Sequence, residues 1–487
     1  MEPAATPIPP PKRYPASPAR LLAAVAIVFL IVFLFLRVGF VEPFGVPTGS
    51  MAPTLIGNHR EAPCPRCGYA VRVGIPTAGE RAGFFADIPC PNCGKHVNLS
   101  EARDINGDRL LVDKNIYQLR SPRRWEVAVF RCSADLSKPY VKRVVGLPNE
   151  EIQILDGDAF ANGELLRKSL REVRETRVPV FNLSYSPSPG GWSPRWFVYP
   201  PEADARLPRD AGREPSPADD TVLQNGTLTL DASAGPQQEV RLEYRNVNLA
   251  DRREEPIKSG NSYDGGVRRE SNLYAVHDFY FKCDVEVISA TVDSTFALRL
   301  FDGLDAVAVE VSVGKKATGQ VRMTHGQDAI SSAAKVALET GSTYAVEFAF
   351  VDRRASFAID GKLVTAPSDL PAEKKRGEVR RPLQLGARGC RLVLKNVILD
   401  RDIHYTQAGK HGTRTPAVLG PTEYFMLGDN SGNSQDSREW PDPGVPESDF
   451  IGKPFLIHQP LKLGGVSVGG RDRAYQTLDW SRLRWLH

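Results

Sequence analysis

Two side chains of this sequence could act together as a nucleophile and its base. Ser50 lies in the glycine- and proline-rich segment 44–55, FGVPTGSMAPTL, and Lys142 lies in the apolar segment 140–148, YVKRVVGLP. A serine hydroxyl is a weak nucleophile at its ordinary pKa and needs a base. A buried lysine can be that base, because desolvation disfavours its charged form. The neighbouring Arg143 is a poor base, since guanidinium keeps its proton in proteins. The pair predicts catalysis by a serine with a lysine base.

Two further segments carry polar residues in a distinctive order. They are 107–114, GDRLLVDK, and 425–438, FMLGDNSGNSQDSR. With the serine and lysine segments they resemble, in the same order along the chain, the type I signal peptidases of bacteria. These are membrane-anchored Ser/Lys proteases that cut signal peptides from exported proteins. The resemblance implies an antiparallel β core with the serine on a loop and the lysine on a strand. It also implies chemistry without a cofactor.

The resemblance assigns roles to individual residues. Ser50 is the expected nucleophile and Lys142 the general base. The oxyanion would be held by the backbone N–H of Ser50 and the hydroxyl of Thr48. Supporting roles fall on residues of the last polar segment: Ser434 orients the lysine, Asp436 and Arg438 form an ion pair, and Asp429 and Asn430 shape the loop.

The same resemblance places substrate pockets beside the nucleophile. Their walls would be small and apolar, and would accept Ala, Gly or Ser at the first and third positions before the cleaved bond. The residues expected to form these walls are Phe44, Val46, Pro47, Met51, Leu55, Tyr140 and Val141.

An apolar run near the N-terminus predicts a membrane anchor over 20–41. Residues 21–36, LLAAVAIVFLIVFLFL, contain no polar side chain. A spanning helix needs about 20 residues, which the run reaches if Arg37 extends to the interface. The alternatives are a cleaved secretory signal and a buried core helix. No small-residue cleavage site precedes Glu42-Pro43, and no polar face is present, so a retained anchor is favoured.

Charges beside this run predict its orientation. Lys12, Arg13 and Arg20 precede it, and only Arg37 lies in the stretch that follows. Positively charged flanks stay in the cytoplasm. We therefore expect a single-pass protein of the plasma (inner) membrane, with a Pro-rich cytoplasmic tail over 1–19 and the catalytic region on the outer face.

Four cysteines in segment 58–105 form two similar motifs. Cys64 and Cys67 belong to CPRCG, and Cys90 and Cys93 belong to CPNCG. Two such motifs at this separation are typical of a zinc ribbon, in which four thiolates bind one structural ion. The segment is too small to bury a core of its own, so a metal would stabilise it. A pair of disulfides is the alternative. The remaining cysteines are scattered and are expected to be inert: Cys132, Cys283 and Cys390.

Alternating apolar residues predict a mainly β protein with two insertions in the catalytic core. The expected divisions are core segments 42–57, 106–182 and 404–464, the zinc ribbon 58–105, a linker 183–225, a β-sandwich 226–403 and a C-terminal segment 465–487. The sandwich weakly resembles the concanavalin-like jelly rolls of laminin-G and glucanase-related domains. It could bind glycan or cell wall, or be a structural domain without a ligand. We expect it to be autonomous and separate from the catalytic core.

The remaining observations limit the choice of function. The 487 residues carry a formal net charge of +4, so no nucleic-acid-binding surface is indicated. The expected partners are signal peptides, membrane lipid and, through the sandwich, glycan. Self-cleaving repressor-type proteases also use a Ser/Lys pair, but they are soluble. A membrane-tethered glycan-binding protein with a degenerate peptidase core is the other alternative. The tryptophans at 480 and 485 could lie on a membrane or belong to a last strand packed on the core.

Overall fold

The computed structural model describes most of the chain. The described residues are 18–76, 87–132, 135–185, 195–199, 215–219, 221–224, 226–247, 253–266, 273–372, 375–468 and 471–486. Side chains at 31–38, 136–137 and 465–474 are outside this description. The predicted Pro-rich tail lies outside it almost completely, as do Lys12, Arg13 and the side chain of Arg37.

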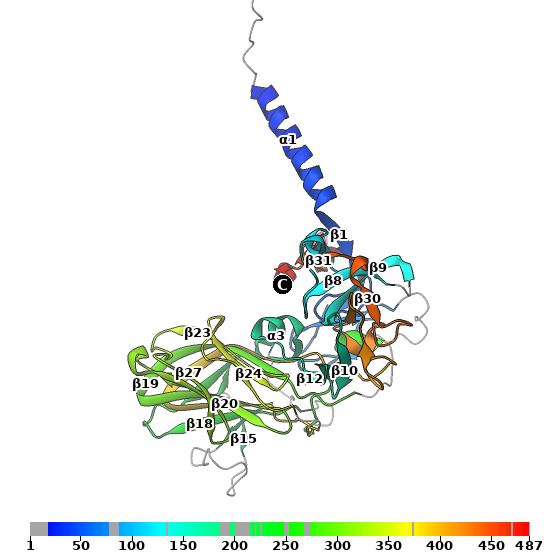
Figure 1. Cartoon of the computed structure of the whole chain (residues 1–487). Coiled ribbons are helices and arrows are strands. Elements are labelled where there is room, and N and C mark those ends of the chain that lie inside the picture. Colours follow the sequence, from blue (N-terminus) through cyan, green and yellow to red (C-terminus); the bar gives the residue numbers. More distant parts are fainter. Residues whose placement is uncertain are drawn as a thin grey trace, which may run out of the picture.

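The apolar run near the N-terminus forms helix α1 (Pro18–Gly39), which extends away from the rest of the molecule (Figure 1). Among the residues and side chains that the structure describes, no helix is long and apolar enough to cross a membrane. The helix leads directly into strand β1.

The protein is mainly β, as predicted, and the paired strands of its sheets run antiparallel. One sheet contains Lys142, the predicted base, and is called the catalytic sheet. It has the order β1-β7-β31-β8-β9-β29-β30, with β34 beside β31. Its strands are β1 (Val41–Gly45), β7 (Arg109–Asp113), β8 (Val127–Cys132), β9 (Asp135–Gly146), β29 (Glu423–Leu427), β30 (Gly444–Pro446), β31 (Phe450–Ile457) and β34 (Arg484–Trp485). The short helix α2 (Ile116–Leu119) follows β7.

The order of this sheet brings distant parts of the sequence together. β9 pairs with its neighbour in sequence, β8, on one side and with the much later β29 on the other. Alternation positions the side chains of β9, because successive residues of a strand point to opposite faces. Because β29 pairs with β9, the loop that follows β29 lies beside the strand that carries Lys142.

A smaller sheet, in the order β12-β11-β10-β28, packs beside the catalytic sheet. Its strands are β10 (Glu151–Leu155), β11 (Asp158–Ala161), β12 (Glu164–Leu165) and β28 (Ala417–Val418). Asp156-Gly157 and Asn162-Gly163 have positive φ and form the turns that connect β10, β11 and β12. Helix α3 (Leu170–Thr176) follows and begins with a capping box between Ser169 and Glu172.

The four-cysteine segment forms two small sheets. One has the order β3-β2-β6 and the other pairs β4 with β5. Their strands are β2 (His59–Pro63), β3 (Ala70–Gly74), β4 (Asp87–Pro89), β5 (His96–Asn98) and β6 (Asp104–Ile105). The core of this segment contains the four cysteines together with Val71, Val73 and Ile88.

The inserted β-domain (residues 178–401) surrounds a large apolar core of its own. Its long strands β19 and β27 pair with each other along most of their length. The strands are β13 (Val178–Asn182), β14 (Trp196–Tyr199), β15 (Ser216–Pro217), β16 (Leu223–Gln224), β17 (Thr227–Asp231), β18 (Glu239–Tyr244), β19 (Phe279–Phe301), β20 (Ala306–Val313), β21 (Gln320–His325), β22 (Asp328–Ala334), β23 (Thr343–Val351), β24 (Arg354–Ile359), β25 (Lys362–Leu363), β26 (Ser368–Asp369) and β27 (Leu383–Arg401).

Two predicted boundaries of this domain are wrong. Residues 178–182, assigned to the catalytic core, form β13 and pair with β27. The described parts of the predicted linker 183–225 form β14, β15 and β16, which pair within the inserted β-domain. Proline and charge in this stretch favoured a linker, and strands of only two to four residues are too short to show an alternating pattern.

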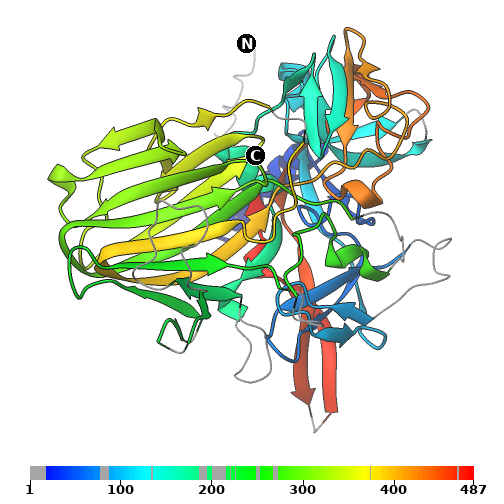
Figure 2. The same cartoon turned by 90° about the horizontal axis from the view of Figure 1, so that it is seen from below.

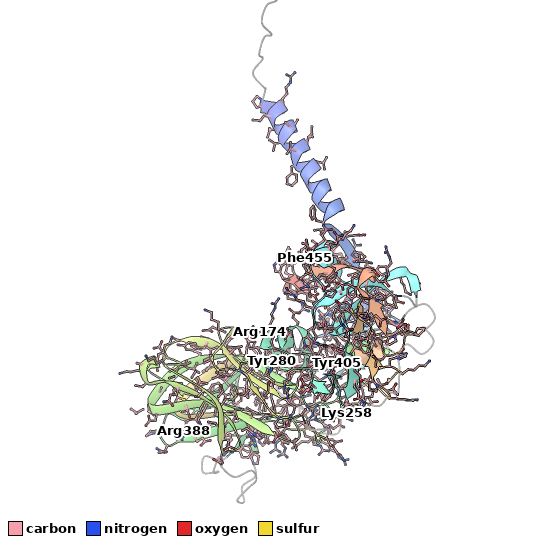
Figure 3. The ribbon with its side chains drawn as sticks, viewed as in Figure 1. Arg174, Lys258, Tyr280, Arg388, Tyr405 and Phe455 are labelled. Atoms are coloured by element: carbon pink, nitrogen blue, oxygen red, sulfur yellow. The ribbon has the colours of Figure 1, made fainter. Side chains whose placement is uncertain are left out.

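Short 3₁₀ turns connect several of these elements. They are η1 (Leu183–Tyr185), η2 (Ser262–Gly266), η3 (Lys316–Thr318), η4 (Ser431–Asn433), η5 (Glu447–Asp449) and η6 (Trp480–Arg482). Near the C-terminus, β32 (Leu461–Val468) and β33 (Arg471–Leu478) form a hairpin (Figure 2), and β34 pairs with β31. The ring of Trp485 stacks on Phe455 at 5.8 Å, close to the base of α1 (Figure 3).

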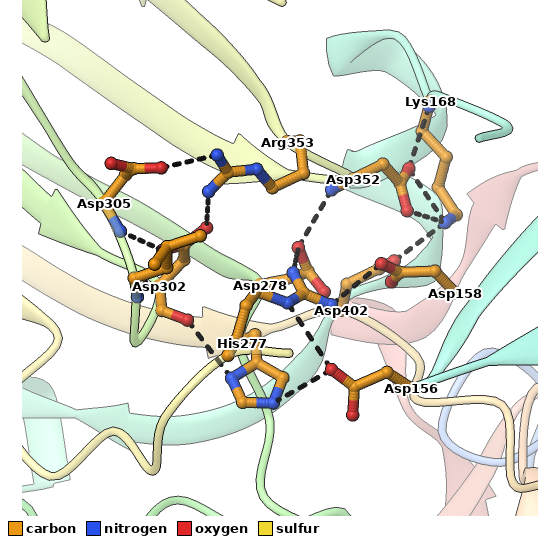
Figure 4. A network of polar contacts seen from close by, with 12 residues as sticks. Asp156, Asp158, Lys168, His277, Asp278, Asp302, Asp305, Asp352, Arg353 and Asp402 are labelled. Atoms are coloured by element: carbon orange, nitrogen blue, oxygen red, sulfur yellow. Dashed lines mark hydrogen bonds and ion pairs between the residues drawn. The ribbon is translucent and has the colours of Figure 1, made fainter. Parts of the chain in front are cut away.

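Buried polar contacts join the inserted β-domain to the catalytic core (Figure 4). Lys168, just before α3, donates to Asp352 Oδ2 at 3.1 Å and to Asp402 Oδ2 at 2.8 Å. Arg376 donates to Asp158 Oδ2 of β11 at 2.8 Å and to Asp278 Oδ1 at 3.3 Å. Because each of these groups is almost fully buried, the two parts are fixed to each other by charge pairing as well as by packing.

A second group of contacts attaches α3 to the surface of the inserted β-domain. Arg174 Nε and the Tyr280 hydroxyl each donate to Glu347 Oε2 at 2.7 Å. Figure 3 shows Arg174 and Tyr280 close together, far from Arg388 at the outer part of the domain.

Candidate active site

Ser50 and Lys142 lie in hydrogen-bond contact. The Lys142 Nζ atom donates to Ser50 Oγ at 2.7 Å. Lys142 lies on β9 opposite Ala128 of β8, and only 2% of its surface is exposed. Ser50 lies in the turn that follows β1 and is half-buried. A nucleophile and a base at this distance can exchange a proton directly.

The surroundings of Lys142 favour its neutral form. Burial lowers the pKa of Lys142 to about 8, against the weaker opposing effect of Asp436. A lysine with a pKa near the working pH can accept a proton from a hydroxyl group. The site therefore contains a base that is partly neutral at mildly alkaline pH.

Each carboxylate near Lys142 is paired with an arginine. Asp436 accepts from Arg438 Nε and Nη2 at 2.8 Å each, in a fully buried pair. Asp429 accepts from Arg143 Nε at 2.8 Å and from Nη2 at 2.6 Å, and both side chains have no exposed surface. These pairs leave little negative charge to hold a proton on the lysine.

The role of Arg143 was not predicted from the sequence, which considered it only as a base. An arginine inside an apolar strand requires a carboxylate partner, because an unpaired buried charge is very costly. That requirement was a usable signal, but the sequence could not identify Asp429 as the partner. Arg143 also donates to the carbonyl of Trp125 at 2.5 Å.

Ser434 differs from its expected role. Its hydroxyl donates to Asp436 Oδ2 at 2.8 Å. The hydrogen bond from Ser434 to Lys142 that the resemblance implies is not found among the hydrogen bonds of the described residues. An ionised carboxylate is a strong acceptor, so the single hydroxyl proton of Ser434 is directed at Asp436.

The loop after β29 holds the backbone around the nucleophile. The Asn430 N–H donates to the Ser50 carbonyl at 3.0 Å, and its Nδ2 donates to the Gly49 carbonyl at 2.9 Å. A Cβ atom at Gly428 would lie 2.5 Å from the Ser50 carbonyl oxygen, so this approach requires glycine. Asn430 and the backbone at position 428 therefore fix the turn that presents Ser50.

The predicted pocket residues occupy three environments. Val46, Met51 and Leu55 are fully buried in one core cluster, with Phe44 and Val141 half-buried at its edge. Pro47 is exposed, and so is Thr48, the predicted oxyanion donor. Tyr140 packs separately, against Phe130 and Trp440.

The four predicted metal ligands converge. The Sγ atoms of Cys64, Cys67, Cys90 and Cys93 lie within 4.8 Å of one another. The Cys64–Cys93 and Cys67–Cys90 separations are 3.5 and 3.6 Å, far longer than a disulfide bond. Four thiolates about 2.3 Å from one zinc ion would be about 3.8 Å apart, so this arrangement fits a tetrahedral ion. The motifs are alike in backbone too, with Gly68 and Gly94 at positive φ.

Comparison with known proteins shows similarity to one family over two segments of the chain. The model of "Signal peptidase, peptidase S26" matches residues 98–202 and 352–458. The matched segments contain Lys142 and the loop 428–438, whereas Ser50 lies before them. Part of the second segment lies in the inserted β-domain.

Curated relatives agree with this match over limited lengths. "Probable signal peptidase I-2" of Synechocystis sp. is 36% identical over 64 residues, covering 12% of this chain and 29% of the relative. "Signal peptidase I" of Rickettsia massiliae is 28% identical over 143 residues, covering 29% of this chain and 43% of the relative. The chain thus spans less than half of the length of either relative.

Among solved structures, the carbohydrate binding module CBM66 from Bacillus subtilis is similar to part of the chain. The TM-score is 0.20 at 17% sequence identity, covering 26% of this chain and 75% of that chain.

Proposed function

We propose that the protein is a serine endopeptidase that removes signal peptides from exported preproteins, because two segments of this chain match the signal peptidase (peptidase S26) family model. The observation that carries the proposal is the hydrogen bond between Lys142 Nζ and Ser50 Oγ inside a buried, charge-balanced site. The bond joins a nucleophile to a base whose pKa is suited to catalysis.

In the proposed reaction, Ser50 Oγ attacks the scissile carbonyl carbon while Lys142 Nζ takes the hydroxyl proton. The tetrahedral intermediate carries its negative charge on the former carbonyl oxygen, which accepts from the Ser50 N–H and the Thr48 hydroxyl. Collapse breaks the C–N bond, and the lysine returns its proton to the leaving amine. Water, activated by the same lysine, then hydrolyses the acyl-enzyme. Asp429 and Asp436 keep their arginine partners throughout.

Specificity in this proposal comes from the apolar residues around Ser50. Phe44 and Val141, half-buried at the edge of the core cluster, would line the positions for small substrate side chains. The buried Val46, Met51 and Leu55 would support them from behind. A bulky side chain before the cleaved bond would then have to displace a packed core.

We propose that α1 associates the protein with the inner membrane and leaves the catalytic sheet on the outer face. The support is the apolar sequence of the helix and its direct connection to β1. Fractionation of membranes followed by alkaline washing tests this. Release of the full chain by carbonate would contradict an integral anchor.

The four-cysteine cluster is proposed to bind one structural zinc ion with no part in the chemistry. Its four sulfur ligands and its closed, buried geometry are those of a structural site. Metal analysis should give one zinc per chain, lost in Cys64→Ser. Oxidation of all four sulfurs in the purified protein, with no metal present, would contradict it. Glycan binding by the inserted β-domain remains a prediction of the sequence alone.

The decisive experiment is cleavage of a preprotein by the full chain in lipid. Wild-type protein should release the mature product after a small residue, and Ser50→Ala should not. Substitution of the exposed Ser233 by alanine is the matched control and should leave the rate unchanged. Equal cleavage by Ser50→Ala and the wild type would overturn the proposal.

A further inference from the structure

One short segment of the inserted β-domain contacts the loop that carries Ser50. This loop, residues 46–58 between β1 and β2, is called the nucleophile loop. Turn η2 lies between strands β18 and β19 in the sequence, far from both Ser50 and Lys142. In space, its Asp264 Oδ1 accepts from Asn430 Nδ2 at 2.7 Å and from Asn433 Nδ2 at 2.8 Å. The inserted β-domain is therefore not separate from the catalytic core, contrary to the expectation from the sequence.

Asp264 determines how the Asn430 amide is oriented. The two N–H groups of that amide donate to Asp264 Oδ1 and to the Gly49 carbonyl. An amide can turn over and exchange its oxygen with its nitrogen, but both partners here are acceptors, so the nitrogen must face them. Without the carboxylate, only the Gly49 carbonyl would hold this orientation.

Tyr263 contacts the same loop from a second direction. The side chain is 5% exposed and packs against Ala52 and Ile56, both in the loop after Ser50. Its hydroxyl donates to the Asn58 carbonyl at 3.0 Å. A Cβ atom at Gly49 would overlap the Tyr263 ring, so the ring rests directly on the backbone before the nucleophile.

The same ring also touches the four-cysteine segment. A Cβ atom at Gly74, the last residue of β3, would overlap the Tyr263 ring as well. A Cβ atom at Gly265 would lie 2.9 Å from Ile88 Cδ1 of β4. Turn η2 thus packs between the nucleophile loop and the small sheets. A shift of η2 would therefore change the contact of the Tyr263 ring with the Gly49 backbone.

We propose that Tyr263 and Asp264 are positioning residues for the catalytic serine, an inference that rests on the proposed peptidase function. They act on Gly49, whose carbonyl accepts from Asn430 Nδ2 and from the Ala52 N–H at 3.0 Å. Fixing Gly49 fixes the next residue, Ser50, at hydrogen-bond distance from Lys142. The inserted β-domain thereby completes the active site.

Four variants of the full chain test this inference by kinetics. Asp264→Ala and Tyr263→Ala should lower kcat about 10–100-fold with little change in KM, since small misplacements of reacting groups are this costly. Asp264→Asn, which keeps an acceptor oxygen, and Tyr263→Phe, which keeps the ring, should recover most of the rate. Asp231→Ala, at the exposed end of β17 in the same domain, is the control and should match the wild type.

A second measurement does not depend on activity. Hydrogen–deuterium exchange of segment 48–57 should be faster in Asp264→Ala than in the wild type, while exchange in β20 and β23 stays the same. Unchanged exchange in this segment together with wild-type kcat would overturn the inference, whether or not Tyr263→Ala folds. If the wild type itself cleaves no preprotein, the proposed function fails, and the exchange data still decide whether η2 holds the loop.

Discussion

Two lysines of this protein are equally buried and have opposite charge preferences. Lys142 in the catalytic sheet and Lys168 at the domain junction are 2% and 3% exposed. Burial lowers the pKa of Lys142 to about 8. At Lys168, burial acts in the same direction, but Asp352 and Asp402 together raise its pKa well above the ordinary value.

The difference lies in the partners of the nearby carboxylates. At Lys168 the aspartates contact the ammonium group directly, and the Trp125 ring lies 4.3 Å from Nζ. At Lys142 the aspartates are already bound by Arg143 and Arg438, and the lysine contacts a neutral hydroxyl. Desolvation alone thus does not decide the charge of a buried lysine. The arginines that occupy the neighbouring carboxylates help to keep the pKa of Lys142 low, as its proposed role as a base requires.

The largest expected effect comes from removing the base. Lys142→Met should lower preprotein cleavage by roughly 10⁴-fold or more, because nucleophile and base act as a unit. Its stability at neutral pH should not fall, since the variant removes a lysine that is unfavourable to bury. Cleavage assays and urea unfolding measure the two quantities. Wild-type cleavage by this variant would contradict the comparison.

The matching change at the junction should affect stability instead. Lys168→Met leaves Asp352 and Asp402 buried without their cation, so unfolding free energy should fall by about 3–5 kcal/mol. Urea unfolding of wild type and variant measures this loss. Adding Asp352→Asn and Asp402→Asn should restore part of the stability. A variant as stable as the wild type would show that the junction pair is dispensable.

The two lysines should also differ in how stability depends on pH. The folded pKa of Lys142 lies below its unfolded value, so between about pH 8 and 10 the unfolded state binds more protons and stability rises with pH. The rise should approach about 3 kcal/mol and disappear in Lys142→Met. The pKa of Lys168 is raised in the folded state. Its contribution to the free energy of unfolding is therefore fully present over this range and is lost only at higher pH. Unfolding curves at several pH values, compared between the wild type and Lys142→Met, measure the difference.

The smallest expected effect tests the role of the arginines. In the wild type, kcat should rise with pH through about 8, as Lys142 loses its proton. Arg438→Gln leaves the Asp436 charge unpaired near the lysine, so the midpoint of this rise should move up by about 1 unit. Arg438→Lys keeps the positive charge and should move it less. An unchanged midpoint in Arg438→Gln would mean that the arginine does not tune the base.

Much of the fold could be predicted from local sequence patterns. The mainly β character was predicted because a period of two is visible within a few residues of strands such as β7 and β23. The continuity of strand β19 is not visible in the sequence, because its polar middle contains a bulge near Asp293, where φ is positive and β27 continues the pairing. The short strands β14 and β15 were missed, since strands of two to four residues are too short to show an alternating pattern.

The site was predictable only in part, for a related reason. Ser50, Lys142 and the loop 428–438 carry family motifs, and the structure brings them together. The Arg143–Asp429 pair and turn η2 depend on contacts between residues that are hundreds of positions apart. No local pattern encodes such contacts, so they could be found only from the three-dimensional arrangement.

The pairing of the first and last strands of the inserted β-domain has a consequence for how the chain folds. β13 and β27 place Val178 opposite Arg401, so the ends of the domain are adjacent once it has formed. β9 can then meet its late partner β29 by closing a much shorter effective loop, which favours closure by on the order of 1 kcal/mol. During synthesis, the domain can fold before residues 425–438 leave the ribosome. The nucleophile and base would therefore be assembled last, after most of the polypeptide is already ordered.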